Sequence, residues 1–448
     1  DRNASYGEGH SFFLPGGDNP RLHRRPLYPP ADKSLVWNDE ERAKFPQCGF
    51  RPLVLAYNEP RFLFDFHAAG GLLGYLQAGV TLSNGVSKWF HQWADLRIAY
   101  TEGRMEYTLT DTDFPGVTVR IVAGALAESD GLVLTIAVTG AGESASLVWA
   151  YGGASAFFTN YAMTDPHFTF APEQCAKDDI ELKTVGFSLV RGFDKSDSVM
   201  EQVFAAPRFL PGWKAVVKGG SLPRGTSGLG DPTTFAAAPA ELVASIDRDE
   251  KQRTNCVAVQ QIPLKNDSEP VFIVVGMGGN IVEAIRKPQA AFDAMLERNK
   301  EIASRVVVTT PDPYLNAAVT MMAFATDGTW GDTTVMHGGW SWRFGYLGWR
   351  GWYGSVCYGW TDRIRTAIEN QTTLGLIAGG EDAGALSSLL DTPGGVFYNM
   401  NEVFLDQVRQ YFEYTNDIEL MRKIWPVLTG IIEWEHRRLQ PGNAFLYE

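Results

Sequence analysis

The chain has 448 residues, which is enough for about two to three domains that each bury a core. Hydrophobic residues make up 45% and charged residues 20%, as is ordinary for globular proteins. The net charge of -13 opposes nucleic-acid binding, because a polyanion would be repelled. No apolar stretch reaches the roughly 18 residues of a membrane span. We therefore expect neither nucleic acid nor a membrane as a partner.

The sequence pattern of residues 50 to 275 is typical of β-strands. Apolar and polar side chains alternate there, as in half-buried strands, and Gly, Asp or Pro separates the segments. No helical period lies between them, so we predict antiparallel sheets packed as a large sandwich. The clearest predicted strands are 51–57, 62–66, 97–100, 105–109, 117–122 and 132–138.

Two glycine-containing segments need separate interpretation. Gly219–Pro239 is rich in Gly, Pro, Thr and Ala, and we predict a long loop there. Val271–Ile281 resembles a dinucleotide-binding turn, but the third glycine of that fingerprint is replaced by Ile281. No alternation of strands and helices precedes it, so we predict a last sandwich strand that leads into a helix.

After residue 280 the hydrophobic period becomes helical. Pro288 predicts the start of a helix that runs to about Arg305, and Asp312-Pro313 predicts a capped helix start. Thr361 and Asp362 predict another start. Asn401 opens a further helix, and Asn416 with Glu419 forms a capping box before the last one, which Pro426 should kink.

An aromatic segment stands out in this helical part. Six of the thirteen tryptophans lie between Trp330 and Trp360, separated by glycines and accompanied by arginines. Flat aromatic faces and guanidinium donors suit sugar rings, although such a run could also plug the end of a helical domain. The predicted sugar-binding residues are His337, Trp340, Trp342, Arg343, Trp349, Arg350, Trp352, Tyr353, Trp360 and Arg363.

Cofactor and metal chemistry finds no support in the sequence. No P-loop, HExxH or GxSxG motif occurs. The four cysteines, Cys48, Cys175, Cys256 and Cys357, are far apart and form no CxxC pair, which favours buried free thiols. His337 has no second histidine nearby. We expect no cofactor and no metal.

The order of parts resembles a known superfamily. A sandwich, a linker helix, Thr310-Pro-Asp-Pro313 and a helical domain resemble glycosidases and phosphorylases with a six-hairpin (α/α)6 barrel. The run Gly339–Tyr353 and the segment Gly442–Glu448 look like an uncharacterised family of bacterial polysaccharide-utilisation proteins. The resemblance implies a β-sandwich over residues 1–280, a linker helix over 281–310 and the first part of a barrel over 311–448.

The helices between Asp312 and Gln440 are too few for such a barrel. We expect four or five there, whereas a closed (α/α)6 barrel needs twelve. A partial barrel exposes apolar helix faces, at a cost of roughly 25 cal/mol per Å². We therefore expect an incomplete barrel that a second chain or a missing C-terminal continuation completes.

The expected function is glycoside hydrolysis of polysaccharide-derived oligosaccharides by paired carboxylates, in a periplasmic or secreted protein. Asp362 is the favoured carboxylate, because it follows Trp360 at a helix start, although an Asp there is often a dipole partner. The resemblance makes Glu448 a candidate general acid. Two alternatives stay open: a polysaccharide lyase, and a non-catalytic glycan-binding or assembly protein.

Overall fold

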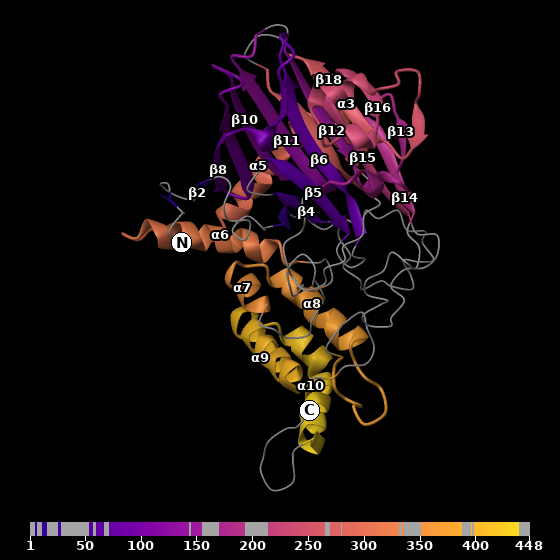
Figure 1. The fold of residues 1–448 in the computed structure, drawn as a ribbon. Coiled ribbons are helices and arrows are strands. Elements are labelled where there is room, and N and C mark those ends of the chain that lie inside the picture. Colours follow the sequence, from indigo (N-terminus) through magenta and orange to yellow (C-terminus); the bar gives the residue numbers. More distant parts are fainter. Residues whose placement is uncertain are drawn as a thin grey trace. The chain divides into compact units, whose positions relative to one another are not determined.

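The chain divides into two compact units, one of Asp1–Trp37 with Arg51–Phe324 and one of Asn38–Phe50 with Ala325–Glu448. Figure 1 shows a computed structural model of residues 1–448, in which strands occupy the first unit and helices the second. The residues that the structure describes are 5–6, 11–15, 26–27, 53–56, 60–66, 71–142, 145–154, 170–192, 214–264, 269–278, 280–330, 334–335, 351–387, 396 and 398–438.

The first unit contains two sheets in its described part, and every strand pair in them is antiparallel. The larger sheet has the spatial order β1 (Ser5–Tyr6), β2 (Ser11–Pro15), β8 (Asp95–Thr101), β9 (Arg104–Thr110), β10 (Thr118–Ala125), β11 (Asp130–Thr139), β19 (Val271–Met277), β15 (Lys214–Leu222), β14 (Phe187–Gly192), β13 (Asp179–Leu182), β17 (Gln252–Thr254). The smaller has the order β16 (Thr226–Gly230), β18 (Val257–Pro263), β12 (Ser146–Gly152), β6 (Gly71–Thr81), β5 (Arg61–Phe66), β4 (Leu53–Ala56), β3 (Pro26–Leu27), with β7 (Ser87–Trp89) beside β6.

Buried apolar side chains alternate with more exposed ones along the strands, and the buried ones form the core between these sheets. In β9, Met105, Tyr107 and Leu109 are buried, while the residues between them are more exposed. The ring of Tyr107 meets Phe62 of β5 edge to face, with ring centroids 6.1 Å apart. The predicted antiparallel sandwich is therefore confirmed. Because β19 pairs antiparallel with β11 and β15, the dinucleotide-binding interpretation is excluded.

The predicted loop over Gly219–Pro239 is wrong. The segment contains the end of β15, the whole of β16 and the short helix η5 (Pro232–Thr234). Its glycines allow close packing: a Cβ on Gly219 would lie 2.6 Å from the Phe187 ring, and one on Gly228 would lie 2.0 Å from Ile246. Glycine in a strand thus marks a close approach of neighbouring side chains here, and not a loop.

Helices follow the last strand of the sandwich. The first unit contains η2 (Phe90–Gln92), η3 (Pro172–Cys175), α3 (Pro239–Ala244), α4 (Ile281–Arg286) and α5 (Pro288–Ala303). The predicted helix from Pro288 is therefore confirmed. Helix α6 (Pro313–Asp327) follows, and the Asp312 carboxylate accepts a hydrogen bond of 2.9 Å from the Tyr314 backbone N–H, which confirms the predicted cap.

The second unit is helical in its described part. It contains α7 (Gly351–Cys357), α8 (Thr361–Leu374), α9 (Tyr398–Thr415) and α10 (Ile418–Arg438), with Pro426 inside α10. Two predicted caps are wrong, because Trp360 is the N-cap residue of α8 and Asp417 caps α10 through the Leu420 N–H at 3.0 Å. Among the described residues, no helix is long and apolar enough to cross a membrane.

This order of parts confirms the predicted fold class. An antiparallel β-sandwich precedes helices, of which α9 and α10 are joined by only two residues and α7 and α8 by three. Such helical pairs are the arrangement expected of an incomplete (α/α)6 barrel. In the described part, five helices, α6 to α10, follow the linker helix α5.

One apolar core holds the helices of the second unit together. Trp352 of α7 is 1% exposed and meets the Phe404 ring of α9 edge to face, at a centroid distance of 5.5 Å. Ile368 of α8 and Ile424 of α10 belong to the same buried cluster. The apolar faces that the helical period predicts therefore meet one another.

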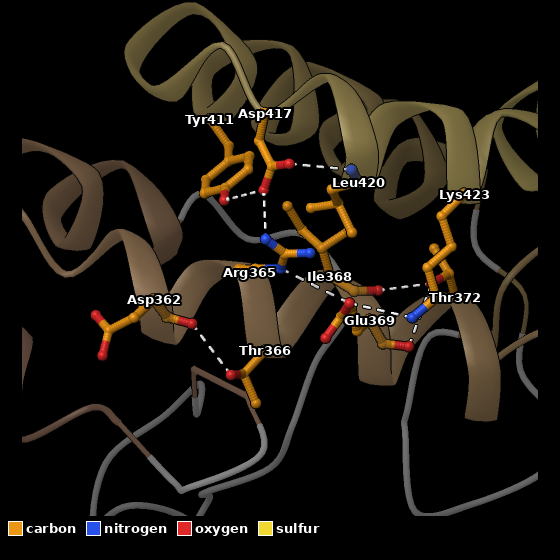
Figure 2. A network of polar contacts seen from close by, with 10 residues as sticks. All are labelled: Asp362, Arg365, Thr366, Ile368, Glu369, Thr372, Tyr411, Asp417, Leu420 and Lys423. Atoms are coloured by element: carbon orange, nitrogen blue, oxygen red, sulfur yellow. Dashed lines mark hydrogen bonds and ion pairs between the residues drawn. The ribbon is translucent and has the colours of Figure 1, made fainter.

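A polar network ties three of these helices together outside the core (Figure 2). Asp417 accepts a hydrogen bond of 3.0 Å from the Tyr411 hydroxyl of α9 and forms an ion pair of 3.1 Å with Arg365 of α8. The hydrogen bond from the Leu420 N–H contributes most to lowering the pKa of Asp417. Glu369 of α8 pairs with Lys423 of α10 at 3.1 Å. These contacts fix the connection between α9 and α10 against α8.

The C-terminal end of α10 carries a carboxyl group with a raised pKa. Glu435 is half-buried, and its Oε1 has no hydrogen-bond partner among the described residues. Burial, followed by the charge of Glu402 on α9, raises the pKa of Glu435 to about 7. This carboxyl is therefore easier to protonate than an ordinary glutamate.

We predict that Trp352→Ala destabilises the second unit by about 3–5 kcal/mol, since it removes a buried indole and leaves a cavity. Urea unfolding followed by far-UV circular dichroism measures this loss. The matched control is Trp425→Ala, which truncates a tryptophan that is 59% exposed on α10. Equal stability of the two variants would place Trp352 outside the core.

We also predict that stability of the second unit falls as pH rises through 7. A carboxyl whose pKa is raised on folding stabilises the folded state below its unfolded pKa, and that contribution is lost as pH passes the folded pKa. Glu435→Gln should therefore raise stability at pH 8 by about 1 kcal/mol after solvent screening, and by less at pH 5. The control is Glu433→Gln, an exposed position on the same helix. A stability gain that does not depend on pH would contradict this.

Candidate functional site

The aromatic segment is anchored at both ends in one core. Val335 lies 4% exposed in the buried cluster of the second unit, and Trp352 belongs to the same cluster. The backbone of Val335 also pairs with Trp330 in an isolated antiparallel bridge. Val335 and Trp352 thus lie in the same core, one on each side of residues 336–351. Most of the predicted sugar-binding residues lie between these two anchors.

Arg363 forms the centre of a polar and aromatic cluster beside the first anchor. Its guanidinium carbon lies 4.7 Å from the Trp360 ring centroid and 5.8 Å from that of Trp330. One guanidinium nitrogen donates a hydrogen bond of 3.0 Å to the Asp327 carboxylate, which is almost fully buried. The structure therefore combines two indoles, a cation and a carboxylate at the start of α8.

The predicted sugar-binding role of Trp352 needs a correction. A ring that stacks on sugar must expose a face, whereas Trp352 is enclosed by the core and packs on Phe404. Its assignment as a sugar-stacking residue therefore conflicts with the structure. Trp360, at 3% exposed, holds Arg363. Tyr353 is half-buried, and its hydroxyl donates a hydrogen bond to Asp406 of α9.

Asp362 occupies an exposed place next to the cluster. It lies in the first turn of α8, where a carboxylate interacts favourably with the helix dipole. Only its backbone carbonyl takes part in the contacts drawn in Figure 2, accepting a hydrogen bond of 3.1 Å from Thr366. Its carboxylate makes no hydrogen bond or ion pair within the described part of the chain. This carboxylate is free to meet a ligand.

Two other carboxylates of the second unit have structural partners. Asp327 pairs with Arg363, as described above. Asp382 accepts hydrogen bonds from the Trp434 indole N–H at 3.1 Å and from Arg438 at 2.6 Å, so it fixes the connection before α9 to the end of α10. These partners leave both groups poorly suited to proton transfer.

The remaining predicted site residues lie outside the described residues. They include every residue of the central part of the aromatic run and the candidate general acid: His337, Trp340, Trp342, Arg343, Trp349, Arg350 and Glu448. Among the described residues, no group of three or more His, Cys, Asp or Glu side chains could hold a metal ion.

The structure also reveals partners that sequence reasoning missed. No sequence signal links Asp327 to Arg363, because the two lie 36 residues apart on different helices. Glu402 and Glu435 likewise come from different helices of one hairpin. Glu435 lies near the end of α10 that Asp382 contacts, whereas Arg363 lies at the start of α8. Since α8 alone spans about 20 Å, we treat Glu435 as separate from the Arg363 cluster.

Comparison with known families matches part of the chain. Residues 69–211, within the sandwich, match a family model described as a domain of unknown function, DUF4450. No match to a curated protein was found.

Solved structures with a similar fold include glycosidases. A bacterial glucoamylase complexed with acarbose has a TM-score of 0.45 and 9% identity, over 96% of this chain and 71% of that one. The family GH92 inverting mannosidase of Bacteroides thetaiotaomicron has a TM-score of 0.45 and 9% identity, over 99% of this chain and 53% of that one. The chain thus spans about half the length of the mannosidase. At TM-scores below 0.5, these similarities assign neither an activity nor a substrate.

Proposed function

We propose that this protein is a glycoside hydrolase that acts on polysaccharide-derived oligosaccharides. The observation that carries the proposal is the cluster of Trp330, Trp360, Arg363 and Asp327, whose residues flank the aromatic segment in the sequence. Trp360 and Asp327 are buried and hold Arg363, so the cluster gives the aromatic segment a fixed support. The cluster holds one end of the segment that carries the remaining aromatic and basic side chains.

In this proposal the aromatic segment binds the sugar. Trp340, Trp342 and Trp349 stack on apolar sugar faces, and His337 donates to a hydroxyl. Arg343 and Arg350 bind hydroxyls or a uronate carboxylate through paired N–H donors. Arg363 has a structural role in this proposal, since its positive charge is already paired with Asp327.

Two carboxyl groups carry out the reaction. Asp362, with its exposed and unpaired carboxylate, is the base or nucleophile, and Glu448 is the general acid that protonates the leaving oxygen. Glycoside hydrolysis needs these groups about 5 to 9.5 Å apart across the scissile bond. The proposed site extends beyond the described residues, and a second chain or a C-terminal continuation that completes the barrel would close it. We place the protein in the periplasm or outside the cell, where polysaccharide fragments are available.

A non-catalytic glycan-binding role is the second candidate. It is favoured by the engagement of Asp327 and Asp382 in structural contacts, which leaves Asp362 as the single unpaired carboxylate next to the Arg363 cluster within the described part of the chain. Such a protein would bind oligosaccharides through the same aromatic segment without cleaving them. A polysaccharide lyase has no comparable observation in its favour.

We predict that residues 1–448 alone hydrolyse no oligosaccharide and that addition of the proposed second chain or C-terminal continuation restores turnover. In that active protein, Asp362→Asn and Glu448→Gln should each lower kcat by about a hundredfold or more with little change in KM, because each removes a proton-transfer or nucleophilic group. Anion-exchange chromatography of a panel of plant and microbial oligosaccharides follows the products. Glu433→Gln, at an exposed position on α10, is the control. Full activity of Asp362→Asn contradicts its assignment as base or nucleophile, whereas robust turnover by residues 1–448 contradicts the proposed completion of the site.

We further predict that Trp349→Ala and Arg350→Ala each weaken oligosaccharide binding about ten- to hundredfold, since stacking and charge-assisted contacts contribute about 1–3 kcal/mol each. The melting temperature should change little. Isothermal titration calorimetry and thermal melts measure both quantities, and Trp352→Ala gives the opposite pattern of lost stability. Unfolding caused by both variants would instead support the plug interpretation of the aromatic run.

A further inference from the structure

The sandwich unit contains a cavity of about 350 Å³ between the turn from β10 to β11 and the corner from α4 to α5. Helix α5 lies against β10 and β11 (Figure 1). The Leu126 backbone N–H donates a hydrogen bond of 3.0 Å to the Gly131 carbonyl, and the Ala291 N–H donates one of 3.1 Å to the Lys287 carbonyl. Both the turn and the corner are therefore fixed. A volume of this size lies within the range of small-molecule sites.

Small side chains keep the cavity open. Five of the residues that line it are alanines: Ala127, Ala284, Ala290, Ala291 and Ala294. Close helix packing does not account for them, because α5 packs against β10 through a large side chain, Met295. A Cβ on Gly124 of β10 would lie only 2.6 Å from the Met295 sulfur. The same helix thus packs tightly at Met295 and leaves space beside its alanines, whose methyl groups form an apolar floor.

Ser129 supplies a polar group that lacks a partner. It lines the cavity, is 3% exposed, and its hydroxyl has no hydrogen-bond partner among the residues that the structure describes. Buried hydroxyls are normally hydrogen-bonded, because burial removes their bonds to water at a cost in free energy. A hydroxyl can donate one hydrogen bond and accept others. A polar group of a ligand in the cavity would therefore satisfy Ser129.

Exposed polar side chains form the rim of the cavity. The Asn280 amide nitrogen donates a hydrogen bond of 3.3 Å to the Glu128 carboxylate, and Lys287 pairs with Glu283 at 2.7 Å. The hydrogen bond from Lys287, followed by the charges of Lys287 and Arg286, lowers the pKa of Glu283. The rim therefore carries charges of both signs, which favours a neutral ligand over an ion.

These groups define the chemistry of the ligand. The carboxylate of Glu128 needs a donor, whereas the ammonium of Lys287 needs an acceptor. A ligand hydroxyl can serve as either, but an amine cation only donates and a carboxylate only accepts. The alanine floor requires C–H groups on the same molecule. A pyranose ring combines an apolar C–H face with a rim of hydroxyls, so it meets all of these requirements.

We propose that this cavity is a second carbohydrate-binding site, which holds one neutral pyranose unit of an oligosaccharide. The choice of a sugar among hydroxylated molecules rests on the proposed function, but the site belongs to the sandwich unit and not to the aromatic segment. Engagement of one oligosaccharide or polysaccharide chain at two sites raises the local concentration of substrate on the protein.

The test uses the 448-residue chain with Trp349→Ala and Arg350→Ala, so that the aromatic segment contributes little to binding. Saturation-transfer difference NMR titrations measure the affinity for the methyl pyranosides of glucose, mannose, galactose and xylose. Ala290→Trp should fill the cavity and weaken binding of the best probe about tenfold or more. Gln289→Trp is the control, since this exposed neighbour on α5 does not line the cavity, and it should bind within about twofold of the parent.

Ser129→Ala gives a second readout that does not depend on filling the cavity. It should weaken binding of the same probe about threefold or more, because it removes a hydrogen bond to the ligand. The melting temperature without sugar should not fall, since the hydroxyl has no protein partner to lose. Thermal melts of every variant measure this.

Failure of all four pyranosides to bind overturns the proposal, and so does unchanged affinity in both Ala290→Trp and Ser129→Ala. Tighter binding of the methyl pyranoside of glucosamine than of glucose overturns the neutral ligand. Turnover that depends on Asp362, without any sugar binding at the cavity, would support the proposed function and contradict this inference. Sugar binding at the cavity of a protein that cleaves no glycoside would do the reverse, so the two failures are distinguishable.

Discussion

The ion pair between Asp327 and Arg363 is the contact on which the start of the helical unit depends. A carboxylate buried as deeply as Asp327 requires a cation, and Arg363 supplies it while its guanidinium lies against Trp330 and Trp360. The pair therefore joins the end of α6 to the start of α8. Loss of Arg363 would remove a cation from a buried carboxylate, which is more costly than loss of a surface ion pair.

The aromatic segment is tied to the core of the second unit on both sides. Val335 and Trp352 belong to one buried cluster, and Val335 also pairs with Trp330. Trp352 and Trp360 are buried and hold the unit together, so in the proposed function the sugar contacts come from the residues between Val335 and Trp352.

Much of the fold could be predicted from local patterns. Alternation along β9 and the Asp312-Pro313 signal are local, and the structure has the expected strand and helix start. The Gly219–Pro239 segment was mispredicted because its glycines are required by Phe187 and Ile246, which are distant in sequence. Composition alone does not distinguish a glycine that turns the chain from one that makes room for a neighbour.

The candidate site was harder to predict because its contacts also join residues that are distant in the sequence. A tryptophan in a glycine-rich run has no helical or strand period, so the sequence could not separate Trp352, which fills the core, from a ring that faces a ligand. Asp362 lies at the helix start that the sequence indicated, but in the first turn of α8 and not at its cap. Long-range pairs such as Asp327 with Arg363 require the folded structure.

The central claim is that the segment between Val335 and Trp352 is a sugar-binding surface beside Asp362. A crystal structure of the protein soaked with an oligosaccharide that it binds tests this most directly. The account predicts a sugar ring stacked on a tryptophan between residues 340 and 349, with the Asp362 carboxylate facing a glycosidic bond. A sugar bound elsewhere, with those tryptophans enclosed by protein, would contradict it.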